Sequence, residues 1–242
     1  MKHCLIQLMS LIPGLVNDNV EEILKYIEDK RFLRINHAWD KFITMRIISI
    51  IMKKSAPVNA LWIFPNMKSL DCGYNRSDIS VLTKLTSLDC DYNESDISHM
   101  TNLTSLICNR NESDISGLIG LTSLDCGYNE SDISGLIGLT SLECCDNESD
   151  ISHMSNLTSL ECNCNKSDIS GLIGLTSLEC CDNESDISGL SSLTSLICNR
   201  NKSDISGLTN LTSLDCNRNK SDISGLIGLT SLICYDNESD IF

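Results

Sequence analysis

Cysteine is the residue type best suited to chemistry in this 242-residue chain, and it recurs at a fixed spacing. Ten of the 14 cysteines stand 18 residues apart: Cys72, Cys90, Cys108, Cys126, Cys144, Cys162, Cys180, Cys198, Cys216 and Cys234. Identical thiols in register lack the crossed geometry that a disulfide needs. The other four, Cys4, Cys145, Cys164 and Cys181, lack the paired C-x-x-C spacing of zinc sites. We therefore expect small core residues, no metal and no cofactor. So many free thiols indicate a reducing compartment, the cytoplasm.

Aspartates form a second column with the same spacing, from Asp78 to Asp240. A row of carboxylates could bind calcium, as in some β-helices. Alternatively, each aspartate could cap a turn by accepting a hydrogen bond from a backbone N–H two or three residues further on. The glycine-rich calcium nonapeptide is absent from the sequence, so we favour capping.

No local group of residues has the pattern of a catalytic site. The four histidines are His3, His37, His99 and His153, and the last two occupy equivalent positions three repeats apart. The serines have no base at a suitable spacing. Carboxylates repeat along the whole array instead of forming one acid–base pair. We therefore predict that the chain is not an enzyme.

The elements that position these columns follow from an internal repeat, of which Leu121–Gly138, LTSLDCGYNESDISGLIG, is one unit. Ten such units run from Met67 to Phe242 without insertion, and the last has 14 residues. In Leu124-Asp125-Cys126 the alternation places Leu and Cys inward and Asp outward, as in a strand. One rung cannot bury its apolar set alone, whereas stacked rungs bury it together. We expect glycines such as Gly117 and Gly120 to form the tight outer turns.

The invariant L-x-x-L-x-C-x-x-N resembles the leucine-rich repeat, and the following S-D-I-S-x-L resembles internalin-like repeats. The resemblance implies a repeat solenoid of the α+β class. It would have ten rungs, a parallel sheet on one face, short turns or 3₁₀ pieces on the other, and an N-terminal helical cap. It also implies an asparagine ladder whose side chains bond to loop backbone groups. The ladder positions are Asn75, Asn93, Asn111, Asn129, Asn147, Asn165, Asn183, Asn201, Asn219 and Asn237.

Charge and hydropathy exclude two classes of partner. The net charge is −15, and residues 67–242 alone carry −18. Nucleic acid demands a Lys/Arg surface, so we expect no nucleic-acid binding. No run of 18 apolar residues occurs, so we expect no membrane span.

Binding should occur where exposed residues vary from rung to rung. An acidic face that carries Tyr, Ile and Arg suits a protein partner with a basic surface. The candidate binding residues on and beside the sheet are Asp71, Tyr74, Asp89, Tyr92, Ile107, Arg110, Asp125, Tyr128, Glu143, Glu161, Glu179, Ile197, Arg200, Asp215, Arg218 and Ile233.

The sequence divides into a head (1–56), a junction half-rung (57–66) and the solenoid (67–242). Val20, Ile23, Leu24 and Ile27 lie at helical spacing on one face. Further helices are expected over 30–42 and 43–54. The simplest role of these helices is a cap over the first rung.

The stretch from Pro13 to Phe42 resembles an F-box. The matching positions are Pro13, Val20, Ile23, Leu24, Tyr26, Ile27, Leu33 and Ile35, whereas Trp39 is displaced by three residues. The resemblance implies docking on a Skp-type linker of a cullin ubiquitin ligase, with substrate held by the repeats. Proteins of this kind occur in large DNA viruses of protists and in their hosts, which would place a viral protein in the host cytosol.

The function that we predict is a protein–protein interaction scaffold, in its most specific form an F-box substrate adaptor. The alternative is a plain leucine-rich-repeat binding protein whose head is only a cap. A secreted calcium-binding or glycan-processing solenoid is a third, less favoured class. At Ile241-Phe242 the sequence stops within a rung, which predicts either a fold-back of Phe242 or an end-to-end dimer.

Overall fold

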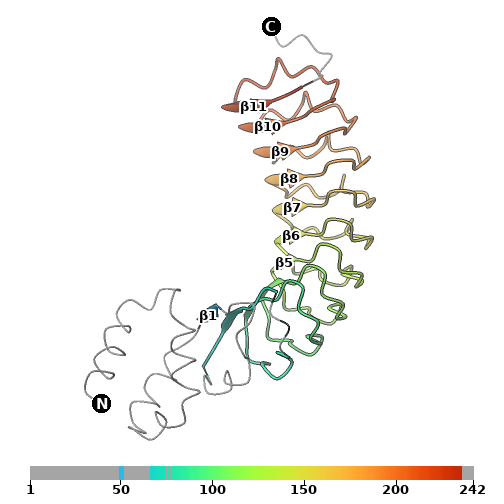
Figure 1. Cartoon of the computed structure of the whole chain (residues 1–242). Helices are drawn as coiled ribbons and strands as arrows, with labels where there is room; N and C mark the ends of the chain where they lie inside the picture. Colours follow the sequence, from blue (N-terminus) through green and yellow to red (C-terminus); the bar gives the residue numbers. More distant parts are fainter. Residues whose placement is uncertain (1–48, 52–65, 75, 77, 236–242) are drawn as a thin grey trace, which may run out of the picture.

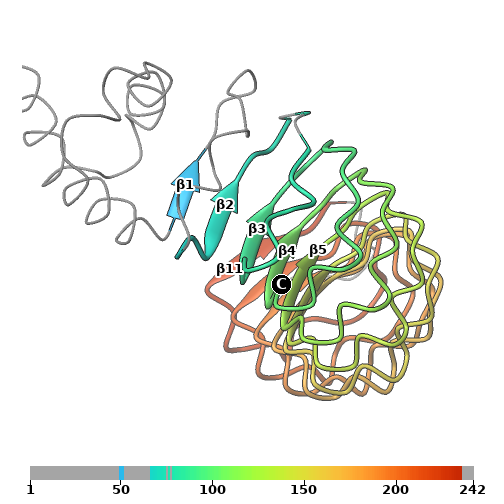
Figure 2. The same cartoon turned by 90° about the horizontal axis from the view of Figure 1, so that it is seen from below.

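The structure, a computed structural model, describes residues 49–51, 66–74, 76 and 78–235. These residues form one parallel sheet of eleven strands that follow one another in chain order. The strands are β1 (Ser49–Ile51), β2 (Ser69–Asp71), β3 (Ser87–Asp89), β4 (Ser105–Ile107), β5 (Ser123–Asp125), β6 (Ser141–Glu143), β7 (Ser159–Glu161), β8 (Ser177–Glu179), β9 (Ser195–Ile197), β10 (Ser213–Asp215) and β11 (Ser231–Ile233). They line the concave side of a curved stack, with the turns on the opposite side (Figures 1 and 2).

The register between strands confirms that one repeat makes one coil. From β2 onward each residue pairs with its equivalent 18 positions later, for example Leu124 with Leu142. The pairing of β1 with β2 differs, because Ser49 pairs with Ser69 and the step is therefore 20 residues. Like residues lie above like along the repeat array, which is why columns in the sequence become rows in space.

Each rung contributes the same apolar side chains to one continuous core. In the rung that contains β5, Leu121, Leu124, Cys126, Ile133 and Leu136 are all at most 2% exposed. The cysteine column is buried from Cys72 to Cys216, whereas Cys234, in the last described rung, is half-buried. The predicted interior row of thiols is therefore confirmed for the described rungs.

The side opposite the sheet consists of short turns. In one rung the Leu118 N–H donates to the Ile115 carbonyl at 3.0 Å, and the Leu121 N–H donates to Leu118 at 3.1 Å. The described residues contain neither α-helix nor 3₁₀ helix, so of the two predicted outer conformations only the turns occur there. No helix that could cross a membrane is found in this part of the chain.

The helix expected over 43–54 is wrong where the structure describes it, because Ser49–Ile51 form β1. Hydrogen bonding to β2 extends the sheet into the segment that the sequence assigned to the head. The F-box-like positions at Pro13, Val20, Ile23, Leu24, Ile27 and Leu33 lie outside the described residues, as do Asn75, Asn237 and residues 57–65.

Candidate functional site

The exposed face of the sheet carries a continuous row of carboxylates. Asp125, Glu143, Glu161 and Glu179 occupy the outward positions of four consecutive strands, β5 to β8. Ile107 lies on the preceding strand and Ile197 on the following one. A shallow groove of about 340 Å³ runs along these six strands and includes the serines beside the carboxylates. The sequence assigned all six of these outward residues to the binding face, and the structure brings them into one groove.

The groove crowds like charges in a partly buried setting. Burial is the main cause that raises the pKa values of the Asp125 and Glu143 carboxyls. The other carboxylates of the row raise the pKa of Glu143 further, whereas a hydrogen bond from Asn109 partly offsets the rise at Asp125. The Oδ1 atom of Asp125 is buried and has no hydrogen-bond partner. No side chain in the row forms an ion pair with a described residue. The row therefore carries negative charge that the rest of the described chain leaves uncompensated.

The same outward column continues beyond the groove. Asp71 and Asp89 lie on β2 and β3, and burial raises the pKa of Asp89 in the same way. Asp215 lies on β10 and accepts a hydrogen bond from the Asn217 side chain at 2.9 Å. Ile233, on β11, is 45% exposed. These residues extend the face but do not line the groove.

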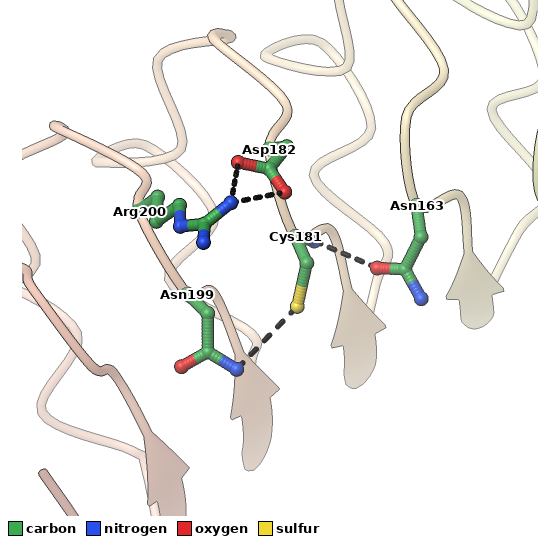
Figure 3. A network of polar contacts seen from close by, with 5 residues as sticks. All are labelled: Asn163, Cys181, Asp182, Asn199 and Arg200. Atoms are coloured by element: carbon green, nitrogen blue, oxygen red, sulfur yellow. Dashed lines mark hydrogen bonds and ion pairs between the residues drawn. The ribbon is translucent and has the colours of Figure 1, made fainter.

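A row of amide contacts beside the groove was not foreseen from the sequence. The Asn163 side chain donates to Glu179 Oε1 at 2.8 Å. It also accepts from the Cys181 N–H at 2.8 Å, the contact that Figure 3 shows. Asn199 Oδ1 likewise accepts from the Asn217 N–H at 2.9 Å. The available signal was the Asn or Asp that stands at the second position after five of the strands, at Asp91, Asn109, Asn163, Asn199 and Asn217. They hold successive rungs together at the rim of the face.

The third residue after the strand adopts a left-handed conformation in nine described rungs, and no described glycine does so. The nine residues are Tyr74, Tyr92, Arg110, Tyr128, Asp146, Cys164, Asp182, Arg200 and Arg218, with φ between 56° and 64°. We call this row the left-handed column. From Tyr92 to Arg218 each member is the third residue of a tight turn. In one of these turns the Asn111 N–H donates to the Cys108 carbonyl at 3.0 Å. Such a turn favours Gly or Asn at this position, so each residue here carries a conformational cost of about 1 kcal/mol. Gly117 and Gly120 lie in the outer turns as expected, but neither has a positive φ.

The first four members of the left-handed column stack on one another. The Tyr74 and Tyr92 rings lie 4.7 Å apart and nearly parallel. The Arg110 guanidinium lies between the Tyr92 and Tyr128 rings, 5.2 Å from the Tyr92 centroid and 4.8 Å from the Tyr128 centroid. The three tyrosines are nevertheless 38% to 56% exposed. All four residues are among the candidate binding residues predicted from the sequence, and they stack because neighbouring rungs lie in register.

Four of the five remaining members of the left-handed column are charged. Arg200 Nη1 lies 3.2 Å and 3.3 Å from the two carboxylate oxygens of Asp182, which stands one rung earlier (Figure 3). Cys164 is exposed between Asp146 and Asp182. Arg218 follows Arg200 in the next rung. The column therefore contains both partners that a guanidinium prefers, an aromatic face and a carboxylate.

The asparagines that follow this column lie inside the solenoid. Asn93, Asn111, Asn129, Asn147, Asn165, Asn183, Asn201 and Asn219 are at most 2% exposed. Asn147 is representative: Nδ2 donates to the Asn129 carbonyl at 2.6 Å and to the Ser131 carbonyl at 3.2 Å. Its Oδ1 accepts from the Ser149 N–H at 2.9 Å. Each amide thus bonds to its own turn and to the preceding rung.

The turn aspartates cap as expected. The Asp132 Oδ1 accepts the Ser134 N–H at 2.9 Å, and the same contact recurs from Asp78 to Asp222. Hydrogen bonds from the serine lower the pKa of these carboxyls, Asp132 among them. Within the described ranges no three His, Cys, Asp or Glu side chains form a group that could hold a metal.

The interior thiols are held in a protonated state. All thirteen described cysteines are free. Burial raises the pKa of Cys144 and of Cys180 to about 12. A thiol with so high a pKa reacts slowly, because the thiolate is the nucleophile.

Comparison with solved structures places the fold among leucine-rich-repeat solenoids of the internalin type. The functional domain of InlJ from Listeria monocytogenes, described as including a cysteine ladder, matches with a TM-score of 0.60 and 27% identity over 77% of this chain. This chain corresponds to 53% of that domain's length.

Two further bacterial proteins share the fold. The internalin InlF, also from Listeria monocytogenes, matches with a TM-score of 0.58 and 20% identity over 93% of this chain and 91% of its own. A leucine-rich-repeat protein from Leptospira interrogans matches at 0.56 and 19% identity, over 77% of this chain and 64% of its own. Comparison with protein-family profiles and with curated proteins gives no match.

Proposed function

We propose that this chain is a non-enzymatic protein-binding scaffold whose sheet face holds an extended basic segment of a partner. The observation that carries the proposal is the row from Asp125 to Glu179, in which four carboxylates have no cationic partner among the described residues. Burial is the main cause that raises the pKa values of Asp125 and Glu143, and nearby carboxylates add to it; a basic segment would stabilise their charged forms. Complementary charge also speeds association and selects the partner.

The spacing of the rungs defines the segment that suits the groove. Parallel strands lie about 4.8 Å apart, so the four carboxylates cover roughly 14 Å. An extended peptide places side chains of one face about 6.7 Å apart, so about three Lys or Arg residues at alternate positions match the row. Ile107 and Ile197 at the two ends of the groove offer apolar contacts to the flanking residues.

The test is titration of the full chain with a fluorescent nine-residue peptide that alternates arginine with serine. Changing both Glu143→Gln and Glu161→Gln should weaken binding about tenfold, since each lost surface ion pair is worth up to about 1 kcal/mol. The matched control changes Asp168→Asn and Asp186→Asn, which removes two charges from the turn side. Equal affinity of the two double variants, or no binding by the wild type, would contradict the proposal.

The substrate-adaptor role is a more specific proposal, supported by the resemblance of Pro13–Phe42 to an F-box. Its test is a pull-down of the full chain with a Skp-type linker, with Ile23→Asp and Leu24→Asp as the disrupting changes. Loss of capture in both variants is expected. Capture that survives them, or no capture at all, leaves the scaffold with a head that serves only as a cap.

Two further proposals concern compartment and assembly. The free thiols support the cytoplasm, which would be the host cytosol for a viral protein. An end-to-end dimer is supported by β11, where Leu232 is 39% and Ile233 45% exposed. Light scattering should show a dimer that becomes monomeric on Leu232→Lys, and a monomer in the wild type would contradict the dimer.

A further inference from the structure

Arg110 shows how the left-handed column receives a guanidinium on an aromatic face. Its guanidinium is stacked between Tyr92 and Tyr128, at 5.2 Å and 4.8 Å from the two ring centroids. Arginine is the cation that stacks best on aromatic faces, because its guanidinium is planar and weakly hydrated. Arg110 covers the face of Tyr128 that points toward the N-terminal end of the array.

Arg200 shows the second way in which the column receives a guanidinium. It reaches back one rung to Asp182 and contacts both carboxylate oxygens, at 3.2 Å and 3.3 Å. Both residues are members of the column, so the contact is made within one row and between adjacent rungs. An arginine in this row is therefore stabilised by a ring or by a carboxylate in a neighbouring rung.

Both kinds of guanidinium-binding group, a ring and a carboxylate, occur in adjacent rungs at Tyr128 and Asp146. No arginine of the column lies between these two residues. Tyr128 is 56% exposed, and Asp146 follows it directly in the column. The Asp146 carboxylate has neither a hydrogen bond nor an ion pair with any described residue. Because aspartate is much shorter than tyrosine, the outer part of the Tyr128 ring extends beyond it. Beside Asp146 a hollow of about 800 Å³ is lined by Glu130, Glu148 and Asp150, which add negative charge.

We propose that Tyr128 and Asp146 together bind an arginine side chain of a partner protein. The guanidinium lies against the face of Tyr128 opposite Arg110 and donates hydrogen bonds to the Asp146 carboxylate. The partner's guanidinium then lies between Tyr128 and Asp146 and extends the stack of two rings, a guanidinium and a ring that the first four members of the column form. This inference rests on the proposed function and assigns arginine, in preference to lysine, to one point of the basic partner.

The experiment compares the nine-residue arginine–serine peptide with its lysine–serine counterpart on the full chain. Tyr128→Asn removes the ring and Asp146→Asn removes the carboxylate, each in a separate variant. Asparagine is chosen because it tolerates the left-handed conformation. Tyr128→Phe keeps the ring face. Tyr74→Asn is the matched control. Tyr74 belongs to the same column and has a similar backbone conformation, with φ 62°, but it lies away from the proposed binding point.

We expect the wild type to bind the arginine peptide about three- to tenfold more tightly than the lysine peptide, as stacking and bidentate hydrogen bonding require. Tyr128→Asn and Asp146→Asn should each remove most of this preference. Tyr128→Phe and Tyr74→Asn should keep it. In the combined variant the loss should be smaller than the product of the single losses, because both residues contact one group.

The inference is overturned if Tyr128→Asn and Asp146→Asn both keep the arginine preference, or if the wild type shows none. Should Tyr128→Asn fail to fold, Asp146→Asn at its exposed site decides the result. If peptide binding depends on Glu143 and Glu161 but not on Tyr128 or Asp146, the scaffold proposal stands and this inference falls. If neither peptide binds the wild type, both fall.

Discussion

The side-chain amide of Asn147 donates to the backbone carbonyl of Asn129, 2.6 Å away and one repeat earlier. The two residues are equivalents in adjacent rungs, and both are buried. The same contact joins Asn165 to Asn147 at 2.6 Å and Asn183 to Asn165 at 2.7 Å. These buried amides therefore couple the rungs to one another, in addition to the sheet hydrogen bonds.

Replacement of Asn147 by alanine should lower the free energy of unfolding by about 3 kcal/mol, because it leaves the buried Asn129 carbonyl and the half-buried Ser149 N–H without partners. Urea denaturation followed by circular dichroism measures the change. Asn156→Ala is the control, since that exposed amide makes a single bond, to the Ile137 carbonyl at 3.0 Å. An equal decrease in the free energy of unfolding in the two variants would show that the buried ladder amides stabilise the fold no more than an exposed amide does.

Asp125→Asn should stabilise the fold by about 1 kcal/mol at pH 7, because it removes a charge from a partly buried carboxyl with an unpaired oxygen. Burial raises the pKa of Asp125 above its ordinary value of 3.8. The cost of folding the charged form is therefore fully present above the raised pKa. It shrinks as pH falls through that pKa and is absent below the ordinary value. Denaturation at pH 7 and pH 3 should show a gain only at pH 7.

The turn aspartates should show the opposite sign. Hydrogen bonds from Ser134 lower the pKa of Asp132 in the folded state. Its contribution to stability is present above the ordinary pKa and is lost as pH falls through the lowered one. Asp132→Asn should therefore be neutral or slightly destabilising at pH 7. A gain equal to that of Asp125→Asn would contradict the assignment of Asp132 as a cap.

The native fold should protect the interior thiols from a thiol reagent at pH 8. Cys164 is exposed and should react at once, whereas the buried column from Cys72 to Cys216 should react only on unfolding. Burial both blocks access and raises the pKa, to about 12 for Cys144. Titration with Ellman's reagent in buffer and in guanidinium counts the two classes. Cys164→Ser should remove one fast thiol, and rapid labelling of every thiol in the native state would contradict the buried row.

Cys164→Gly should raise the free energy of unfolding by up to about 1 kcal/mol, because glycine adopts a positive φ at no steric cost. Cys164 has φ 62°. The control is Cys145→Gly, at a position without a positive φ, where the extra freedom of glycine in the unfolded chain should destabilise. Urea denaturation of both variants measures the difference. If the free energy of unfolding changed in the same direction in both variants, the left-handed conformation at Cys164 would carry no cost.

Much of the scaffold could be predicted because the repeat has a single period. Leu124, Cys126 and Asn129 recur every 18 residues, so any arrangement that buries one rung's set buries them all. The inward thiols, the parallel register and the turn aspartates followed from that. The helix expected over 43–54 failed at Ser49–Ile51, because an open strand edge at β2 competes for backbone that local periodicity assigns to a helix.

The sequence by itself determined the coil length, the residues that face inward and the acidic face. Only the tertiary structure decided the left-handed column, because Tyr128, Cys164 and Arg200 are not residue types that mark a positive φ. It also decided the stack of Arg110 between Tyr92 and Tyr128, whose members are 18 residues apart along the chain. The physical reason is that a side chain's type and order are fixed locally, whereas its neighbours across rungs are set by the strand spacing of the sheet.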